Sequence, residues 1–286
     1  MIDLDGAYDL HVHSAPDLFP RIADDRHMVA HAATRGFAGL VMKNHFEGTA
    51  SRAALAAEVA GRLKVYGGLV LNRYVGGINP HAVDAALRLG ARVVWMPTLD
   101  AACHREAFGF GGGFAAQSSG LETSEEGLRI LAEGRLLPEA REVMALVRER
   151  GAALATGHLS FEEIAALVAE AEAQGFRKLI LTHPYDKAPG LSLEQVRLLA
   201  RPHVRVEFVF CSITPRWAFT DAATIAHCIK TVGPARVLIS SDGGQAHNPM
   251  PADGYHRFVK LLHAEGIAAE DFRVMCCDNG DDLLHG

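Results

Sequence analysis

The sequence predicts an α/β protein built as one (β/α)8 TIM barrel. Apolar strand-like segments and helical segments alternate eight times along the 286 residues. The strand-like segments are rich in β-branched residues and lack a polar face, which is typical of a parallel sheet buried on both sides. Eight such units in a chain of this length fit a single barrel domain covering residues 1–286. A doubly wound open sheet is the alternative.

The first four strand and helix units are regular. Strands are expected at residues 8–13, 38–45, 64–71 and 91–96, with helices at about 24–35, 49–60 and 80–89 between them. Gly36, Gly61 and Gly90 follow these helices directly. Glycine is common after a helix because it readily adopts the left-handed conformation needed there, so the three glycines support the predicted helix ends.

The alternation is interrupted after the fourth strand. Residues 99–122 show neither a helical nor a strand period and contain a cluster of glycines, including Gly111, Gly112 and Gly113. Long loops in compact domains are usually functional or mobile, so we expect a long Gly-rich lid over an active site. A phosphate-binding loop is the alternative, but the G-x-x-x-x-G-K-[ST] pattern is absent. Residues 128–137 then predict a small hairpin that turns at Glu133 and Gly134.

The remaining four units again alternate. Strands are expected at residues 152–157, 178–182, 204–210 and 237–241. Pro138 predicts the start of a helix that ends near residue 150, and Ser160 predicts the cap of a helix over 161–174. Ser192 begins a helix that ends before Pro202. Further helices are expected at 220–232 and 253–265, followed by a short one within 271–284.

Potential metal ligands lie at the ends of the predicted strands. His11 and His13 are two residues apart on the first strand, so their side chains point to the same face. Further strands end in Lys43 and His45, His158, His183, and Asp242. In a closed barrel these carboxyl ends meet on one face, where catalytic residues lie. Imidazole and carboxylate suit Zn²⁺ and similar divalent ions, so the sequence predicts a metal-dependent enzyme.

The order of these residues along the chain resembles the metal-ligand pattern of the amidohydrolase superfamily, which consists of metal-dependent hydrolases. The His-x-His pair, the histidines ending strands five and six, and the aspartate ending strand eight occur in that order, and the tail from Cys277 is similar to the superfamily's closing segment. The resemblance implies that His11, His13 and Asp242 hold one metal. It also implies that His158 and His183 hold a second metal or polarise the substrate. The short segments Met42-Lys-Asn-His45 and Trp95-Met-Pro-Thr98 indicate an uncharacterised branch of this superfamily.

The sequence departs from the superfamily pattern at strand four. Two-metal members usually place a carboxylated lysine or a glutamate there, but this strand ends in Trp95-Met96-Pro97-Thr98. Lys43 is the nearest candidate for a bridging carboxylated lysine. The alternatives are that Lys43 pairs with a carboxylate or binds an anionic substrate directly. One or two divalent ions are therefore expected, with Zn²⁺ as the first candidate and Mn, Fe or Ni as alternatives.

The expected reaction is hydrolysis of a C–N or C–O bond in an amide, cyclic amide or lactone. A metal would activate water, with Asp242 as general base and His183 as a ligand or oxyanion stabiliser. His45, Asn72, Arg73 and His104 are candidate substrate-binding residues. Three alternatives stay open: a phosphoesterase of the histidinol-phosphatase type, a metal-assisted decarboxylase or other lyase, and a regulatory protein with a degenerate site.

Composition narrows the expected partners to a small-molecule substrate. The formal net charge is -6 with mixed signs, which argues against a nucleic-acid partner. No apolar run approaches the ~20 residues of a membrane span. The acidic N-terminus lacks a secretory pattern, and the five cysteines form no C-x-x-C pair, so a reduced cytoplasmic protein is expected. A homo-oligomer that pairs through its outer helices is left open.

Overall fold

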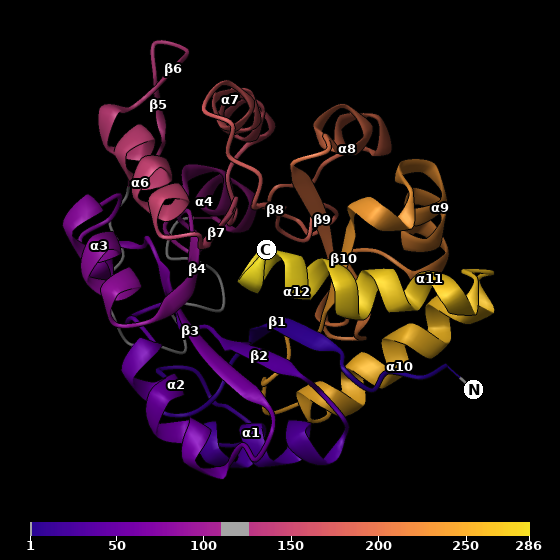
Figure 1. The fold of residues 1–286 in the computed structure, drawn as a ribbon. Helices are drawn as coiled ribbons and strands as arrows, with labels where there is room; N and C mark the ends of the chain where they lie inside the picture. The colour runs from indigo at the N-terminus through magenta and orange to yellow at the C-terminus, as the bar shows by residue number, and fades with distance from the viewer. Residues whose placement is uncertain (1, 110–125) are drawn as a thin grey trace.

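The computed structural model describes residues 2–109 and 126–286, and they form a nearly closed barrel of eight parallel strands. The order around the ring is β1-β2-β3-β4-β7-β8-β9-β10, with helices on the outside (Figure 1). The strands are β1 (Tyr8–Val12), β2 (Gly39–Met42), β3 (Lys64–Val70), β4 (Ala91–Trp95), β7 (Ala153–Ala155), β8 (Leu179–Leu181), β9 (Val204–Val209) and β10 (Val237–Ser240). The predicted (β/α)8 barrel is confirmed, and every strand lies within its predicted range.

The helices follow the predicted alternation. They are α1 (Asp25–Thr34), α2 (Ala50–Ala56), α3 (Pro80–Arg88), α4 (Ala102–Phe108), α6 (Pro138–Glu149), α7 (Phe161–Ala173), α8 (Leu193–Leu199), α9 (Ala222–Val232), α10 (Pro251–Ala264), α11 (Ala269–Arg273) and α12 (Asn279–His285). The predicted caps Ser160 and Ser192 each form a capping box with the residue three positions later. Such a box satisfies amides that a helix start leaves without partners.

The segment after β4 differs in part from its prediction. Residues 102–108 form α4, so the prediction of a loop was wrong there. Seven residues make only about two helical turns, which is too short for a clear period. The remainder of the predicted lid, residues 110–122, lies outside the described residues. The predicted hairpin is confirmed as β5 (Leu131–Ala132) and β6 (Arg135–Leu136).

The barrel interior is packed with apolar side chains, and Trp95 is the largest of them at 1% exposed. The C-terminal helix α12 covers one end of this core with Leu283 and Leu284. It is fixed there because Asn279 donates a hydrogen bond to the carbonyl of Val237, where β10 begins. In Figure 1, α12 lies across the barrel end that faces the viewer. The carboxyl ends of the strands therefore open on the other side.

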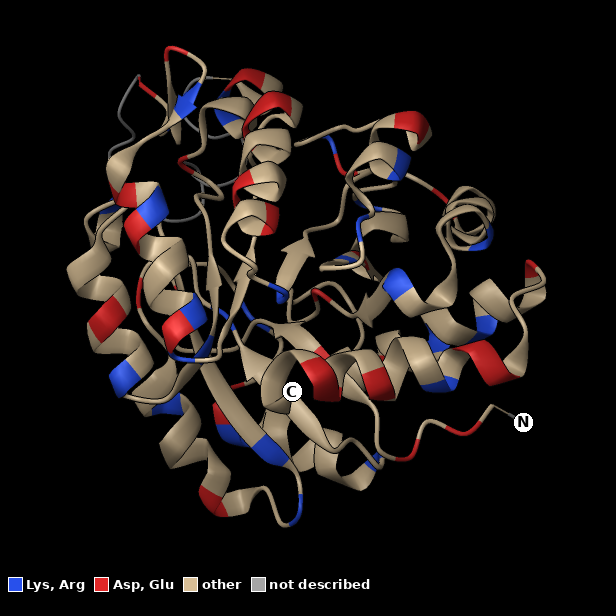
Figure 2. Cartoon of the chain, turned by 45° about the horizontal axis from the view of Figure 1, so that its top comes forward, with Lys and Arg blue, Asp and Glu red and all other residues tan. Residues whose placement is uncertain are grey.

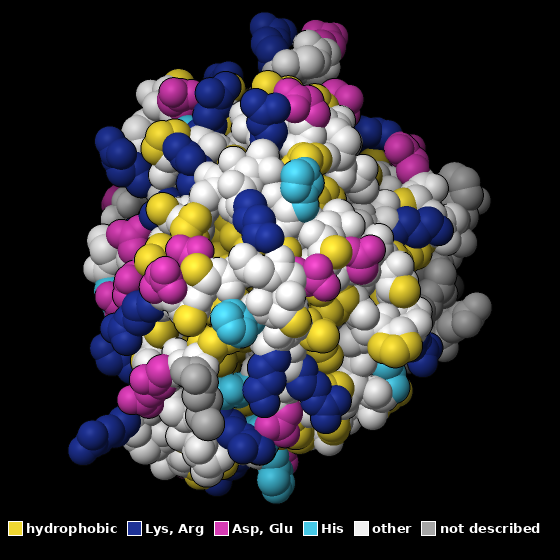
Figure 3. Space-filling model, turned by 90° about the vertical axis from the view of Figure 1, so that its right-hand side faces the viewer, with side chains coloured by type: hydrophobic (Ala, Val, Ile, Leu, Met, Phe, Trp, Pro, Cys, Tyr) yellow, Lys and Arg dark blue, Asp and Glu magenta, His cyan; other side chains and the backbone are white. Residues whose placement is uncertain are grey.

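The surface is chemically mixed. Lys, Arg, Asp and Glu are spread over the outer helices in Figure 2, and both charge signs alternate with hydrophobic side chains on the face in Figure 3. None of the helices in the described part of the chain is long and apolar enough to cross a bilayer.

Asp9 joins the first and last strands of the ring. Its Oδ1 accepts hydrogen bonds from the backbone amides of Ser241 at 2.9 Å and His11 at 3.3 Å. Burial raises the pKa of Asp9 to about 7. Beside it, Val12 and Gly243 form the bridge between the two strand ends. The Asp9 carboxylate thus accepts hydrogen bonds from backbone amides of both strand segments, where β1 and β10 do not pair directly with each other.

We expect Asp9→Ala to lower the free energy of unfolding by about 2–4 kcal/mol, because it leaves two buried amides without an acceptor. Asp9→Asn keeps an acceptor oxygen and is expected to lower it by about 1 kcal/mol or less. Urea denaturation of both variants measures the difference. Equal stability of the two variants would contradict this role for Asp9.

Candidate metal centre

Three potential metal ligands converge where β1 and β10 end. Nε2 of His11 and Nε2 of His13 each lie 3.1 Å from Oδ1 of Asp242. The ligand atoms of all three residues lie within 4.8 Å of one another, and no other such group of three occurs among residues 2–109 and 126–286. We call His11, His13 and Asp242 the ligand group. Asp242 thus lies beside two histidines that precede it by 229 and 231 positions in the chain, and the binding of a metal by these three residues stays a prediction.

Irregular backbone at the ends of β1 and β10 sets the direction in which the side chains of the ligand group point. The register between β1 and β2 shifts between Asp9 and Val12, which marks a bulge. Leu10 packs inside the barrel, whereas Val12 packs against the outer helices. A bulge reorients a strand, and here it brings His11 and His13 to the mouth. Asp242 has φ of +44°, a left-handed conformation that aspartate tolerates better than most residues.

Glu207 on β9 orients His11. Its Oε2 lies 3.3 Å from Nδ1 of His11, and both side chains are fully buried. A carboxylate at Nδ1 keeps the proton on that nitrogen and leaves Nε2 available to a cation. Burial would lower the pKa of His11, but Asp242 and Glu207 outweigh it and raise this pKa to about 9. Sequence reasoning missed Glu207, although an acidic residue inside a predicted buried strand was a signal.

Arg21 contacts the second histidine of the ligand group. Its Nη2 lies 3.1 Å from Nδ1 of His13, and its Nε donates to Oδ2 of Asp17 at 2.7 Å. Burial and then the Arg21 charge hold the pKa of His13 well below its usual value, so the imidazole is neutral at pH 7. Arg21 was also missed, because it lies in an irregular loop without a recognisable motif.

Lys43 lies beside His11 over the indole of Trp95. Its Nζ is 2.9 Å from Nε2 of His11 and 5.4 Å from the Trp95 ring centre. Burial lowers the pKa of Lys43 to about 8. The amine is near enough to contact a cation held by His11. A protonated ammonium would compete with that cation, whereas a neutral or carboxylated amine would bind it.

His158 and His183 lie near the ligand group but outside it. His183 Nδ1 is 3.4 Å from Oδ2 of Asp186, and its ring centre is 5.9 Å from that of His11. His158 Nδ1 is 2.8 Å from Nδ1 of His104, so one of these two nitrogens donates a hydrogen bond to the other. Metal binding by His158 and His183 therefore stays a prediction. Asp186 was not singled out from the sequence.

The four predicted substrate-binding residues fall into two sets. His45 and His104 line the pocket, whereas Asn72 and Arg73 do not. Asn72 is fully buried, and its amide links His45, Thr98 and Asp100 through hydrogen bonds. Arg73 donates to the carbonyl of Glu126. Neighbouring loops already take up polar groups of both residues, and contact of Asn72 and Arg73 with substrate stays a prediction.

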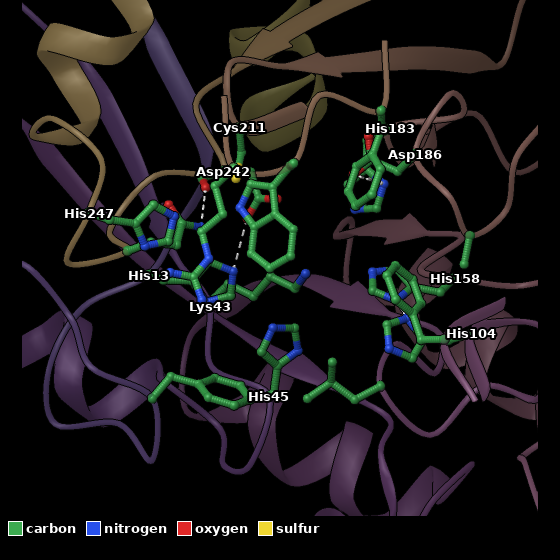
Figure 4. A pocket seen from close by; sticks show the side chains of 18 of the residues that line it. His13, Lys43, His45, His104, His158, His183, Asp186, Cys211, Asp242 and His247 are labelled. Atoms are coloured by element: carbon green, nitrogen blue, oxygen red, sulfur yellow. Dashed lines mark hydrogen bonds and ion pairs between the residues drawn. The ribbon is translucent and has the colours of Figure 1, made fainter. Parts of the chain in front are cut away.

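The pocket above the ligand group has a volume of about 410 Å³, which suits a small molecule. Figure 4 shows His13, Asp242 and His247 gathered on one side of it, and His104 with His158 on the other. His45 lies between the two groups, and His183 lies next to Asp186. Four of the five predicted histidine and aspartate ligands thus line this pocket, and the fifth, His11, is fully buried in contact with Asp242.

The donor set fits a divalent cation. Two imidazole nitrogens and one carboxylate oxygen make the three-ligand set of catalytic zinc sites, which leave a position open. Burial would raise the pKa of Asp242, but His11 and His13 hold it well below its usual value, so it is ionised at pH 7. A cation would replace the protons now shared among these atoms.

Glu207 gives a test of this assignment. Glu207→Leu leaves Nδ1 of His11 without its acceptor, and we expect the affinity for a divalent ion to fall about 10–100-fold. Glu207→Gln retains an acceptor oxygen and is expected to restore most of that affinity. Competition with a chromophoric chelator measures both values. Unchanged affinity in the leucine variant would rule out the orienting role.

Comparison with known proteins identifies a sequence family and a shared fold. Residues 6–207 match the family described as "Family of unknown function (DUF6282)". No curated protein sequence matches significantly. An amidohydrolase from Pseudomonas aeruginosa is 13% identical, with a TM-score of 0.61 over 98% of this chain and 97% of the other.

Two further structures match to a similar extent. An organophosphorus hydrolase from Deinococcus radiodurans is 14% identical, with a TM-score of 0.60 over 98% and 92% of the two chains. N-acetyl-D-glucosamine-6-phosphate deacetylase from Mycobacterium smegmatis is 15% identical, with a TM-score of 0.61 over 98% and 76%. The resemblance to amidohydrolases predicted from the sequence is thereby confirmed for the fold.

Proposed function

The chain belongs to the family of unknown function DUF6282, and we propose that it is a metal-dependent hydrolase of C–N or C–O bonds. The observation that carries the proposal is the ligand group, whose three ligand atoms lie within 4.8 Å of one another at the barrel mouth. Hydrolases such as the organophosphorus hydrolase and the deacetylase share the fold, which supports a hydrolytic reaction by analogy.

His11, His13 and Asp242 would hold one divalent ion, with Zn²⁺ as the first candidate. When bound, the ion would lower the pKa of a water molecule and polarise the substrate carbonyl. Lys43 would join as a further ligand once it is uncharged, and His158 and His183 are the nearest imidazoles for a second ion. A single ion is favoured because the described residues offer one group of three ligand atoms.

Asp242 would act as general base. Its Oδ1 faces both imidazoles and is ionised, and 15% of the side chain is exposed to the pocket. It would take a proton from the attacking water and pass it to the leaving group. His183, held by Asp186, would donate a hydrogen bond to the oxyanion that develops on the substrate. A lactone, amide or cyclic amide suits this arrangement.

Metal analysis combined with an activity screen tests the proposal. Protein purified without a metal-affinity step is expected to contain about one divalent ion per chain. A panel of lactones, amides, phosphoesters and carboxylic acids without a hydrolysable bond then separates hydrolysis from phosphoester cleavage and decarboxylation. Activity is expected to disappear with a chelator and return with Zn²⁺ or Mn²⁺. Protein that binds no ion and cleaves nothing in the panel would refute the proposal.

A further inference from the structure

The charged side chains that line the pocket favour an anionic ligand. Among the described residues, three are cationic, Arg21, Lys43 and Arg216, and two are carboxylates, Asp186 and Asp242. A divalent ion in the ligand group would add two more positive charges at the base of the pocket. An anionic substrate in this partly enclosed space would be attracted to these charges, of which Arg21 is already paired with Asp17.

The two carboxylates already have partners in the protein. Asp242 contacts both imidazoles of the ligand group. Asp186 accepts a hydrogen bond from Ser212 and lies 3.4 Å from Nδ1 of His183. The polar lining that remains consists mainly of cations and imidazoles, which offer hydrogen-bond donors. The pocket is therefore suited to a ligand that presents acceptors.

Arg21 is the cation that is best positioned to bind such a ligand. Its side chain is only 4% exposed, yet it lines the pocket. Oδ2 of Asp17 lies 2.7 Å from both Nε and Nη2 of Arg21, and the guanidinium carbon lies 5.5 Å from the ring centre of Phe19. These contacts fix the guanidinium beside the ligand group. A fixed guanidinium binds carboxylate and phosphate oxygens without a large loss of side-chain freedom.

A cation in the ligand group would also change what Arg21 can bind. An arginine N–H can donate to Nδ1 of His13 only while the imidazole proton is on Nε2. When Nε2 binds a cation, the proton moves to Nδ1, and Nη2 of Arg21 then lacks this acceptor. An anionic oxygen in the adjacent pocket would replace it.

The apolar part of the pocket indicates the shape of the ligand body. Phe19, Leu99, Phe108, Trp217 and Phe219 contribute aromatic and aliphatic surface to the lining. The rings of Trp217 and Phe219 stack with their centres 5.8 Å apart. Flat side chains of this kind pack well against a planar, unsaturated group.

We propose that the substrate of this site is a small organic anion with a flat apolar body, and that Arg21 binds its carboxylate or phosphate oxygens. The inference rests on the proposed metal-dependent hydrolase, because it places the anion beside the ion held by His11, His13 and Asp242. The anionic group is a recognition element and differs from the bond that is cleaved.

Calorimetric titration of metal-loaded protein tests this inference with simple probes. Benzoate and phenyl phosphate supply the two anionic groups on a flat body, and benzamide is the neutral counterpart of benzoate. We expect at least one anion to bind about tenfold or more tightly than benzamide, because charge-assisted hydrogen bonds are about twice as strong as neutral ones. The tighter anion identifies whether the natural group is a carboxylate or a phosphate.

Substitutions of Arg21 test whether this residue binds the anionic group of the ligand. Arg21→Met is expected to lower the affinity for the preferred anion about tenfold or more and to change benzamide binding less. The double variant Asp17→Asn with Arg21→Met avoids leaving a buried carboxylate unpaired and should behave in the same way. Arg88→Met is the matched control: Arg88 forms the same kind of i,i+4 ion pair, with Asp84, but lies outside the pocket lining, so a change of about twofold or less is expected.

The outcomes separate this inference from the proposed function. Equal affinity for benzamide and both anions would overturn the inference, as would an Arg21→Met variant that binds anions as the wild type does. Metal content is measured on the same samples. Protein that lacks a bound divalent ion contradicts the proposed function, whereas protein that holds the ion but shows no preference for anions contradicts the inference alone.

Discussion

Asp242→Asn is expected to lower kcat for any ester or amide that the wild type hydrolyses by about 10³-fold or more. Asparagine cannot accept the proton of the attacking water, and loss of a general base alone costs about 10²–10⁴-fold. The substitution also removes the negative charge from the ligand group, so weaker metal binding adds to the loss. Rates are measured at saturating metal so that the two effects are separated.

The variant is expected to remain folded. Asp242 has φ of +44°, and asparagine adopts this left-handed conformation at low cost. Asp253→Asn on α10 is the control, because it makes the same chemical change at a carboxylate that pairs with Arg35 on the outer surface. An Asp242→Asn variant that holds a full complement of metal and keeps a tenth of the activity would exclude Asp242 as the general base.

The sequence was informative about the barrel because strand burial and strand ends are local properties. Apolar β-branched runs such as residues 237–241 identify buried strands, and glycine or serine marks the ends of helices. Once the strands are counted, the fold brings their carboxyl ends together. That step predicted the meeting of His11 and His13 with Asp242 without any knowledge of tertiary contacts.

The parts that could not be predicted depend on contacts between loops. Asn72 looked available to substrate, but its amide is used to hold the turns after β3 and β4 together. Arg21 reaches His13 only because the loop after β1 folds back, with the Ile22 amide bonded to the Gly244 carbonyl. Neither contact has a period or a motif in the sequence. Glu207 is the exception, since its burial could have been inferred from its strand.

A second large effect is expected from Gly244→Ala, which should lower the free energy of unfolding by about 4 kcal/mol or more and abolish metal binding. Gly244 has φ of +120°, a conformation that alanine strongly disfavours. A Cβ atom at this position would lie 2.7 Å from the carbonyl carbon of His13 and would overlap its oxygen. Because this contact is with backbone, relief requires movement of the strand end that carries His13.

Gly90→Ala is the matched control for this prediction. Gly90 has a similar positive φ, of +103°, but no atom lies within 4 Å of a Cβ built there. Its alanine variant therefore measures the conformational strain without a close contact, which is about 1–3 kcal/mol. Chemical denaturation and metal content of the two variants isolate the effect of close packing against His13. Similar stability and full metal content in both would mean that the end of β1 shifts freely, and that the close approach of Gly244 to His13 does not fix the ligand group.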